Sequence, residues 1–430
     1  MASFTDLVAE RIHFRREEFL AGLSSEPDDE VEQLLATGIQ AHWHPFELEH
    51  TQNMDQSISP AAAVDGSRAI RALSSGADWV IAQALLIGPN GLRNSAVDTI
   101  LLRGEIERPA VDRCAALLMR SLELDLALKF VESGDGHTLI LDGSLYAELP
   151  YLLYRLAIGG YEDLPLKVLE QYLELFDLCQ KREVLLLGIS KSARSAVLGQ
   201  ALLDGSRSLA SLIPQQPGSD TSKPLEADMQ EDVEVSRGDS VNGKNQRRGM
   251  RSGMNGLPTD GELMHRWTKG AGLTDPVLLG SSSFGRAGAI ADEKLTARIQ
   301  QVLLEPQLSP DLQRVLDRLS NAPAIGTFYI RLAPGDDALR VDALASTFGR
   351  NDLRLLRFTR TLVPYTTAIP LVQYLLGEYG GLSVYHAALY VVDKEVRLHA
   401  ATVDHVYLSV LRRQLRQPVQ YDRSTRRFIY

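Results

Sequence analysis

Several features that mark secreted or membrane proteins are scarce in this sequence. It holds two cysteines, Cys114 and Cys179, with no CxxC spacing, so neither a disulfide framework nor a zinc ribbon is supported. The N-terminal segment carries charges throughout and lacks the apolar core of a secretory signal. No uninterrupted apolar run approaches the ~20 residues that span a bilayer. We therefore expect a cytoplasmic protein that contacts no membrane and keeps its thiols reduced and buried.

An excess of positive charge is also missing. The formal net charge is −10, which argues against a passive nucleic-acid coat. This balance is compatible with a nuclease, because bound metal and a local basic groove can hold DNA on an acidic protein. The hydrophobic fraction of 44% is ordinary for a globular protein, and 430 residues suffice for one large elaborated domain or for two.

The sequence does contain one short motif twice: an apolar run that ends in an aspartate followed by glycine. It occurs at Asp65 and again at Asp142, and we predict strands over residues 61–65 and 138–145. Adjacent strands lie ~4.8 Å apart, so aspartates at matching strand ends can share one divalent ion. A third Asp-Gly-Ser, at Asp204, follows a helical segment and is interpreted as a helix stop.

The remaining pattern alternates helices with strands and indicates an α/β fold. A helix over residues 109–131 carries Glu123, and an aliphatic strand over 184–189 ends just before Lys191. Residues 334–337 form a hairpin turn between two later strands. The other predicted strands cover residues 78–88, 97–102, 327–332 and 339–341, and the other predicted helices cover 3–37, 165–181, 195–203, 260–268, 295–304, 352–362, 366–376 and 383–396.

The chemistry of these residues points to phosphodiester hydrolysis. Carboxylates are the ligands that Mn²⁺ and Mg²⁺ prefer, and two such ions ~3.5–4 Å apart can activate water and stabilise a leaving oxygen. Lys191 can offer a positive charge to the scissile phosphate. Each of Asp65, Glu123 and Asp142 taken singly is also compatible with a structural role, so the prediction rests on the set.

Other candidate sites are weaker. His42, His44 and His50 lie close together and are compatible with a metal site, but a polar connector is favoured. Residues 280–286 approach a P-loop but lack its lysine, so nucleotide binding there is rejected. Residues 206–257 are rich in Gly, Ser, Asn and Pro and predict a disordered insertion, whose basic piece at 244–251 is more simply a solvated stretch. The C-terminal tail is arginine-rich and is a candidate DNA path, through Arg412, Arg413, Arg416, Arg423, Arg426 and Arg427.

These elements, in this order, resemble the NurA family of DNA-repair nucleases. The resemblance is carried by AVDGSR at Asp65, MRSLELDLALKF at Glu123, LILDGSLY at Asp142 and LLLGISKSARS at Lys191. Residues 327–342 (TFYIRLAPGDDALRVD) and 381–398 (GLSVYHAALYVVDKEVRL) resemble later blocks of the family. The similarity runs from about residue 58 to 405, apart from the insertion.

The resemblance implies an RNase H-like mixed β-sheet core flanked by helices, with manganese dependence, 5′-to-3′ exonuclease activity and single-strand endonuclease activity. It also implies a role in DNA end processing, as a homodimer joined to a HerA-type hexameric translocase. The family's metal-binding and catalytic residues carry onto Asp65, Glu123, Asp142, Lys191 and Tyr385.

One position departs from the family pattern: Asp393 stands where a histidine follows the tyrosine that matches Tyr385. Aspartate is itself a ligand for manganese or magnesium, so we expect Asp393 to complete the metal site. The alternatives are a catalytically weak subunit that binds DNA or a translocase, and a ribonuclease or other phosphoesterase on the same fold. The expected organisation is an N-terminal helical region (1–57), two halves of the nuclease core (58–205 and 258–430) and the insertion (206–257) between them.

Overall fold

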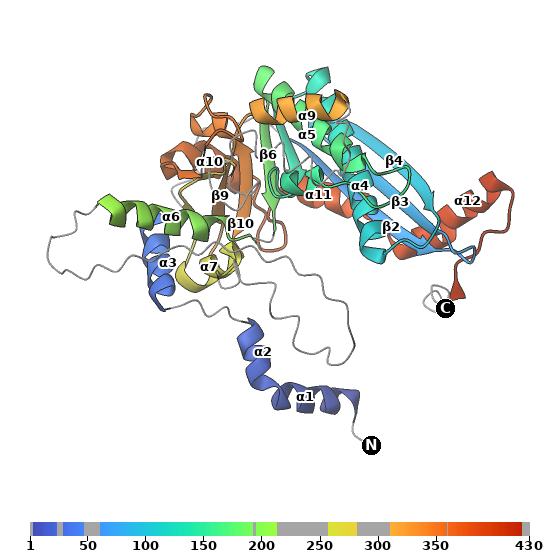
Figure 1. Cartoon of the computed structure of the whole chain (residues 1–430), viewed down its shortest axis with the longest axis horizontal. Coiled ribbons are helices and arrows are strands. Elements are labelled where there is room, and N and C mark those ends of the chain that lie inside the picture. The colour runs from blue at the N-terminus through green and yellow to red at the C-terminus, as the bar shows by residue number, and fades with distance from the viewer. Residues whose placement is uncertain are drawn as a thin grey trace, which may run out of the picture.

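The computed structural model describes residues 3–23, 29–46, 61–191, 195–212, 257–281, 310–358 and 360–423. A mixed β-sheet runs through the molecule, with helices on both of its faces (Figure 1). Its strands lie in the order β1-β7-β9-β10-β6-β5-β2-β3-β4, and β8 and β11 extend it beside β9. Their bounds are β1 Trp43–Pro45, β2 Ala62–Ala72, β3 Asp78–Ile87, β4 Arg93–Leu102, β5 Thr138–Asp142, β6 Leu185–Ser190, β7 Gly272–Thr274, β8 Val277–Leu278, β9 Ile325–Arg331, β10 Leu339–Leu344 and β11 Thr361–Leu362.

The centre of the sheet consists of three parallel strands, β2, β5 and β6. Strand β10 continues it antiparallel to β6, and β3 and β4 continue it antiparallel on the other side of β2. Strands β9 and β10 are buried along their whole length, as expected for strands covered on both faces. This mixed sheet flanked by helices confirms the predicted fold class.

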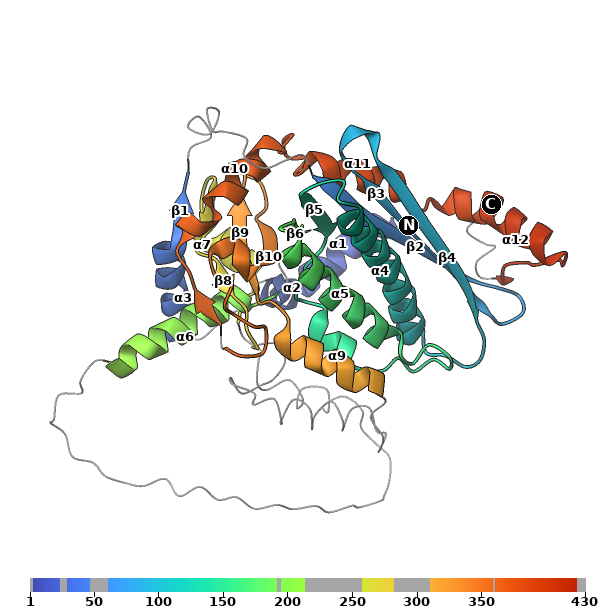
Figure 2. The same ribbon diagram turned by 90° about the horizontal axis from the view of Figure 1, so that it is seen from above.

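Two long helices cover one face of the central strands. Helix α4 (Arg108–Ser133) packs on β2, β3 and β4, and helix α5 (Leu164–Lys181) packs on α4. The opposite face of β2 and β3 is covered by the short helix α11 (Ala387–Val396), as Figure 2 shows. Residues alternate between two cores accordingly: Ala62 and Val64 join the α4 side, whereas Ala63 packs with the α11 side.

The other helices surround this centre. Helix α3 (Asp29–His42) packs its buried Leu35 and Ile39 toward α6 (Val197–Leu212) and α7 (Asp260–Trp267). Helix α1 (Phe4–Phe14), which buries none of its residues, and α2 (Arg16–Leu23) stand away from the sheet in Figure 1. The remaining helices are α9 (Pro310–Asn321), α10 (Ile369–Gly377) and α12 (Leu408–Leu415), with a π-helical turn at Thr402–Tyr407 and 3₁₀ turns at Pro89–Gly91, Leu149–Leu153 (η3), Ala345–Phe348 and Tyr365–Ala368. Within the described residues, no helix combines the length and apolarity needed to cross a bilayer.

Two predicted features are wrong. Residues 352–362 form turns and β11 rather than a helix, because the backbone of Leu353 and Leu355 bonds to Ala324 and Ala322 instead of to itself. The Asp-Gly-Ser at Asp204 does not stop a helix, since α6 continues through it to Leu212. A glycine inside a helix costs roughly 1 kcal/mol relative to alanine, which the rest of α6 outweighs.

Several predictions fall on residues outside the described ranges. They concern the helix at 295–304, most of the insertion, residues 282–286 of the P-loop-like stretch, His50, and the tail residues Arg426 and Arg427. Helix α11 begins at Ala387, later than expected, because His386 caps it through a hydrogen bond from the Leu389 amide.

Candidate functional site

Asp65 and Asp142 lie beside each other in the centre of the sheet. Strands β2 and β5 run parallel with Val64 opposite Leu141, so the next residue of each strand is an aspartate. Ala63 and Ile140 belong to the core on the α11 side. Because side chains two residues apart point to the same face of a strand, Asp65 and Asp142 lie on that side as well. The prediction that two neighbouring strands place the aspartates side by side is confirmed, but the predicted end of the first strand is wrong. Strand β2 continues through Gly66 to Ala72, because residues 66–72 pair with β3, so Asp65 lies within its strand and only Asp142 ends one.

The chain turns sharply after Asp142, and glycine is needed there. Gly143 has a φ of 118°, which L side chains rarely adopt, and its amide donates to the Ile189 carbonyl at 2.8 Å. On the neighbouring strand β6, a Cβ at Gly188 would lie 2.7 Å from the Gly143 carbonyl oxygen. The turn therefore passes close to β6. Asp142 lies opposite Ile189 of that strand, two residues before Lys191.

Glu123 approaches the same point from the opposite face. Its Oε1 lies so close to the backbone of Gly66 that a Cβ there would be 2.3 Å away. Glycine at position 66 therefore lets the Glu123 carboxylate sit against the strand residue that follows Asp65. The side chain is 2% exposed, and its Oε2 accepts from Arg120 Nη1 at 2.5 Å.

Lys191 joins the aspartates of the α11 face. Its Nζ lies 3.1 Å from Asp142 Oδ2 and 3.6 Å from Asp393 Oδ2, on helix α11. The same ammonium stands 5.0 Å from the centre of the Tyr385 ring, a cation–π contact. All six residues singled out from the sequence, from β2, α4, β5, β6 and the α11 region, therefore meet at one location.

This cluster contains more carboxylates than positively charged side chains. Burial and the neighbouring Asp142 raise the pKa of Asp65 to about 6, against the hydrogen bond from the Gly66 amide. Burial also raises the pKa of Glu123 to about 8, although Arg120 opposes the shift. Burial lowers the pKa of Lys191, but Asp142 and the Tyr385 phenol outweigh it and raise that pKa above its usual value. A cation placed here would relieve the repulsion between the acids.

The donor set fits a hard divalent cation, which prefers carboxylate oxygens. Among the described residues, however, no three His, Cys, Asp or Glu side chains are arranged to hold an ion as they stand. The positive charges of the protein explain this arrangement, because Lys191 lies between Asp142 and Asp393 and Arg120 holds Glu123. An ion would need Lys191 to move from this position.

Sequence reasoning missed two contributors to the site. Arg120 lies one helical turn before Glu123 and pairs with it, and that i, i+3 spacing was the available signal. Asp342 accepts hydrogen bonds from Ser144 Oγ at 2.5 Å and from the Leu145 amide at 3.0 Å, so it anchors the turn after Asp142. Its strand, β10, is distant in sequence, and only the folded sheet reveals the contact.

The histidines of the predicted connector lie elsewhere. His42 and His44 both bond to Asp275, at 2.7 and 2.9 Å, and the His44 ring stacks on Tyr365 at 3.8 Å. This arrangement ties β1 to the segment after β7 and favours the structural role. His386 is fully buried, with its ring 5.7 Å from that of Tyr374.

Comparison with solved structures gives one match that shows the same fold and two weaker matches. The crystal structure of the NurA nuclease from Sulfolobus solfataricus superposes with a TM-score of 0.51 at 13% identity, over 95% of this chain and 97% of that one. A structure of NurA bound to dAMP and manganese gives 0.46 at 13% identity, covering 96% and 97% of the two chains. A third, of NurA with manganese, gives 0.45 at 13% identity, covering 95% and 99%. No protein with a curated description matches the sequence.

The sequence itself carries a family signature. The family model described as the NurA domain matches residues 60–369, which is well over half of the chain. The matched segment includes Asp65, Glu123, Asp142 and Lys191, whereas Tyr385 and Asp393 follow it. The chain is thus a member of the NurA domain family.

Proposed function

We propose that this protein is a nuclease that hydrolyses phosphodiester bonds of DNA with divalent metal. The observation that carries the proposal is the convergence of Asp65, Glu123, Asp142 and Asp393 from four separate elements around Lys191. Structural carboxylates are normally matched by donors, whereas burial together with the neighbouring acids raises the pKa of both Asp65 and Glu123. Membership of the NurA family supports the same function.

The four carboxylates would hold Mn²⁺, or Mg²⁺ in its place, as two ions. Bound there, the metal would supply an activated water and stabilise the charge on the leaving oxygen. Arg120 would orient the Glu123 carboxylate through their ion pair. The turn held by Asp342 would keep Asp142 at the end of β5.

Lys191 has a second task in this proposal. In the structure its ammonium bridges Asp142 and Asp393, where it lowers the repulsion between them. With those acids holding metal, the Lys191 ammonium would be available to a phosphate oxygen of the substrate. The Tyr385 ring, 5.0 Å from Nζ, would limit how far the lysine moves and would orient substrate or water.

The finer features of the activity rest on the family resemblance. We propose 5′-to-3′ exonuclease and single-strand endonuclease action in DNA end processing, by a cytoplasmic homodimer that works with a HerA-type translocase. The arginines of α12 and the segment after it, which include the exposed Arg412 and Arg413, would extend the path of the DNA. No predicted step depends on the insertion.

A second candidate function is that of a catalytically weak subunit that binds DNA or a translocase. It is favoured by the observation that Lys191 already neutralises Asp142 and Asp393. If the lysine cannot leave, the metal cannot bind there. A third candidate, ribonuclease action, is compatible with the fold, because the fold alone does not choose the sugar.

The test is cleavage of end-labelled single- and double-stranded DNA, with matched RNA, in manganese, magnesium or chelator. We expect metal-dependent DNA cleavage that disappears in Asp65→Ala and Asp142→Ala. Asp98→Ala serves as the control, because Asp98 is an exposed carboxylate on β4. Binding without cleavage would establish the second candidate, and preferential cleavage of RNA the third.

A further inference from the structure

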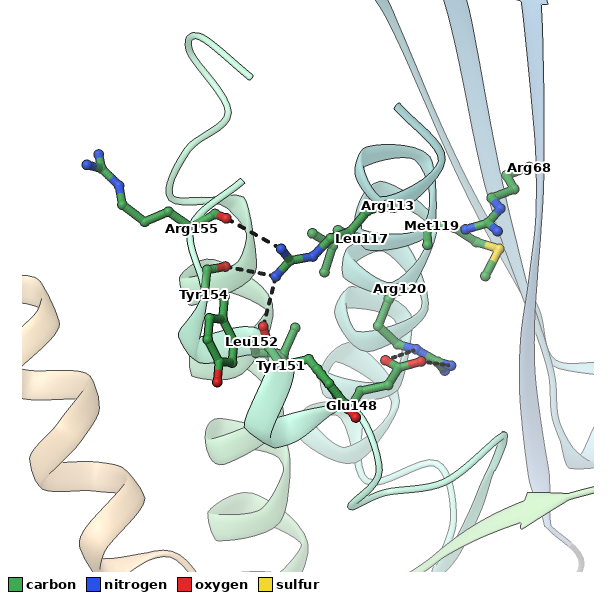
Figure 3. A pocket seen from close by; sticks show the side chains of 11 residues that line it. Arg68, Arg113, Leu117, Met119, Arg120, Glu148, Tyr151, Leu152, Tyr154 and Arg155 are labelled. Atoms are coloured by element: carbon green, nitrogen blue, oxygen red, sulfur yellow. Dashed lines mark hydrogen bonds and ion pairs between the residues drawn. The ribbon is translucent and has the colours of Figure 1, made fainter. Parts of the chain in front are cut away.

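A groove of about 1070 Å³ opens on the α4 side of the sheet, away from Asp393 and Tyr385. Helix α4, strand β2 and the η3 segment form its walls, as Figure 3 shows. The proposed metal site does not use it. Its lining combines arginines with exposed tyrosines, a composition that differs from the acidic character of the whole chain.

The charge of the groove is positive. Among the described residues, Arg68, Arg113, Arg120 and Arg155 line it against one acidic lining residue, Glu148. Behind this lining Arg120 pairs with Glu123 and Arg155 with the exposed Asp163, whereas Arg68 and Arg113 bond to backbone carbonyl oxygens. Arg68 lies exposed on β2, where its Nη1 donates to the Asp112 carbonyl oxygen at 3.2 Å. In a protein of net charge −10, such a local excess selects for an anionic ligand.

The aromatic side chains of the groove are exposed but held on a fixed backbone. Tyr151 is 68% exposed and Tyr154 is 38% exposed. Arg113 Nη2 donates to both of their carbonyl oxygens at 2.8 Å, so its guanidinium clamps the segment that carries them. Exposed tyrosine rings on a fixed backbone offer flat faces on which an unpaired base can stack.

The groove adjoins the carboxylate cluster through one residue, Arg120. Arg120 lines it and also pairs with Glu123. Met119, the preceding lining residue, approaches Gly66 on β2, so closely that a Cβ there would lie 2.6 Å from Met119 Cγ. A strand lying in the groove would therefore run along the arginines and past Tyr151, with Arg120 between it and the buried Glu123 carboxylate.

We propose that this groove binds the single-stranded part of the DNA substrate, with phosphates beside Arg68 and Arg155 and an unpaired base stacked on Tyr151. Stacking on an exposed tyrosine requires a base that is free of its partner, which excludes an intact duplex at this position. The inference rests on the proposed nuclease function for the identity of the strand.

Fluorescence anisotropy of a labelled oligo-dT tests the proposal in chelator, where cleavage is suppressed. We expect Tyr151→Ala to weaken binding about 5- to 150-fold, the range for removing the stacking of one base, and Tyr151→Phe to bind as the unmodified chain does. We expect Arg68→Gln to flatten the plot of log affinity against log salt by roughly 0.7, the value for one phosphate of a single strand. Arg350→Gln, in an exposed pair with Asp352 outside the groove, is the charge control.

The outcomes separate this proposal from the nuclease proposal. Normal binding by Tyr151→Ala, in a chain that cleaves DNA, would overturn the groove assignment and leave the nuclease intact. Tyr151-dependent binding without any cleavage would support the groove and count against the nuclease. Equal weakening by Tyr151→Phe and Tyr151→Ala would overturn stacking as the mode of recognition. Thermal unfolding of each variant, expected to match the parent, excludes loss of folding as the cause.

Discussion

Two groups of buried or partly buried carboxylates differ in their surroundings. Asp260 accepts from Ser195 Oγ, from Tyr329 Oη and from the amides of Val197, Leu198 and Gly199. Asp342 pairs with the buried Arg340 at 2.8 Å and accepts from Ser144 and Leu145. We call Asp260 and Asp342 the matched pair, because each carboxylate has several donors.

The second group, Asp65, Glu123, Asp142 and Asp393, shares two cations: Arg120 pairs with Glu123, and Lys191 lies between Asp142 and Asp393. Repulsion from Asp142 and Asp393 adds to burial in raising the pKa of Asp65, and Asp65 does the same for Glu123. The comparison teaches that burial alone does not identify a functional acid. The matched pair stabilises the fold, whereas repulsion within the second group, which we call the repelling carboxylates, favours the binding of a cation.

The largest expected effect is on catalysis. We expect Asp65→Asn to reduce metal-dependent DNA cleavage by about 10³-fold, because a missing metal ligand removes several kcal/mol of transition-state stabilisation. Single-turnover cleavage by the variant and by Asp98→Asn measures the effect. A reduction of less than tenfold would remove Asp65 from the metal site.

For stability we expect the larger effect in the matched pair and the smaller effect in the second group. Asp342→Ala leaves Arg340 buried without its partner, so we expect a loss of about 3–5 kcal/mol in the free energy of unfolding. Asp65→Ala relieves repulsion, so we expect a change below ~1 kcal/mol in the absence of metal. Denaturant unfolding of both variants in chelator measures the difference. Similar losses of unfolding free energy in both variants would show that the two groups do not differ in their contribution to stability.

The pH dependence sharpens the comparison further. With folded-state pKa values of about 6 and 8, Asp65 and Glu123 retain protons that the unfolded chain loses near pH 4. Their contribution to stability is therefore complete below that range and is lost as the pH rises toward 8. We expect the metal-free protein to lose stability from pH 5 to 8 relative to Glu123→Gln, measured by thermal unfolding at each pH. Parallel curves would contradict the raised pKa of Glu123.

Much of the central sheet could be predicted from the sequence because its signals are local. The run before Asp65, the run before Asp142 and the aliphatic strand before Lys191 each carry their own pattern, and the parallel register then brings them together. The approach of Asp393 to these residues depended on the family resemblance, since its helix is far away in the sequence. The clamp of Arg113 on the η3 backbone has no sequence pattern at all, because its acceptors are carbonyl oxygens.

The errors have the same origin in non-local contacts. Residues 352–362 have helical periodicity, yet buried Leu355 bonds through its amide to the Ala322 carbonyl. Glycine at position 205 looked like a stop, but the packing of α6 against α3 and α7 keeps the helix intact. Local preference was overridden in both cases by partners far along the chain.

The smallest expected effect concerns the C-terminal arginines, which lie outside both groups. Replacing Arg412, Arg413 and Arg416 by Gln should flatten the salt dependence of DNA binding, because fewer counterions are released. We expect the slope to change by roughly 0.7 to 0.9 for each phosphate that the variant no longer neutralises, measured by anisotropy over a salt series. An unchanged slope would show that the tail lies off the DNA path.

The most direct test of the central claim is the stabilisation of the full chain by manganese, measured as the free energy of unfolding across a Mn²⁺ titration at pH 8. At a hundredfold excess over its dissociation constant the ion should add about 2.7 kcal/mol to the parent protein. The account predicts that Asp65→Asn and Asp142→Asn lose this gain and that Asp98→Asn retains it. Equal stabilisation of all four proteins would show that the repelling carboxylates are not the metal site.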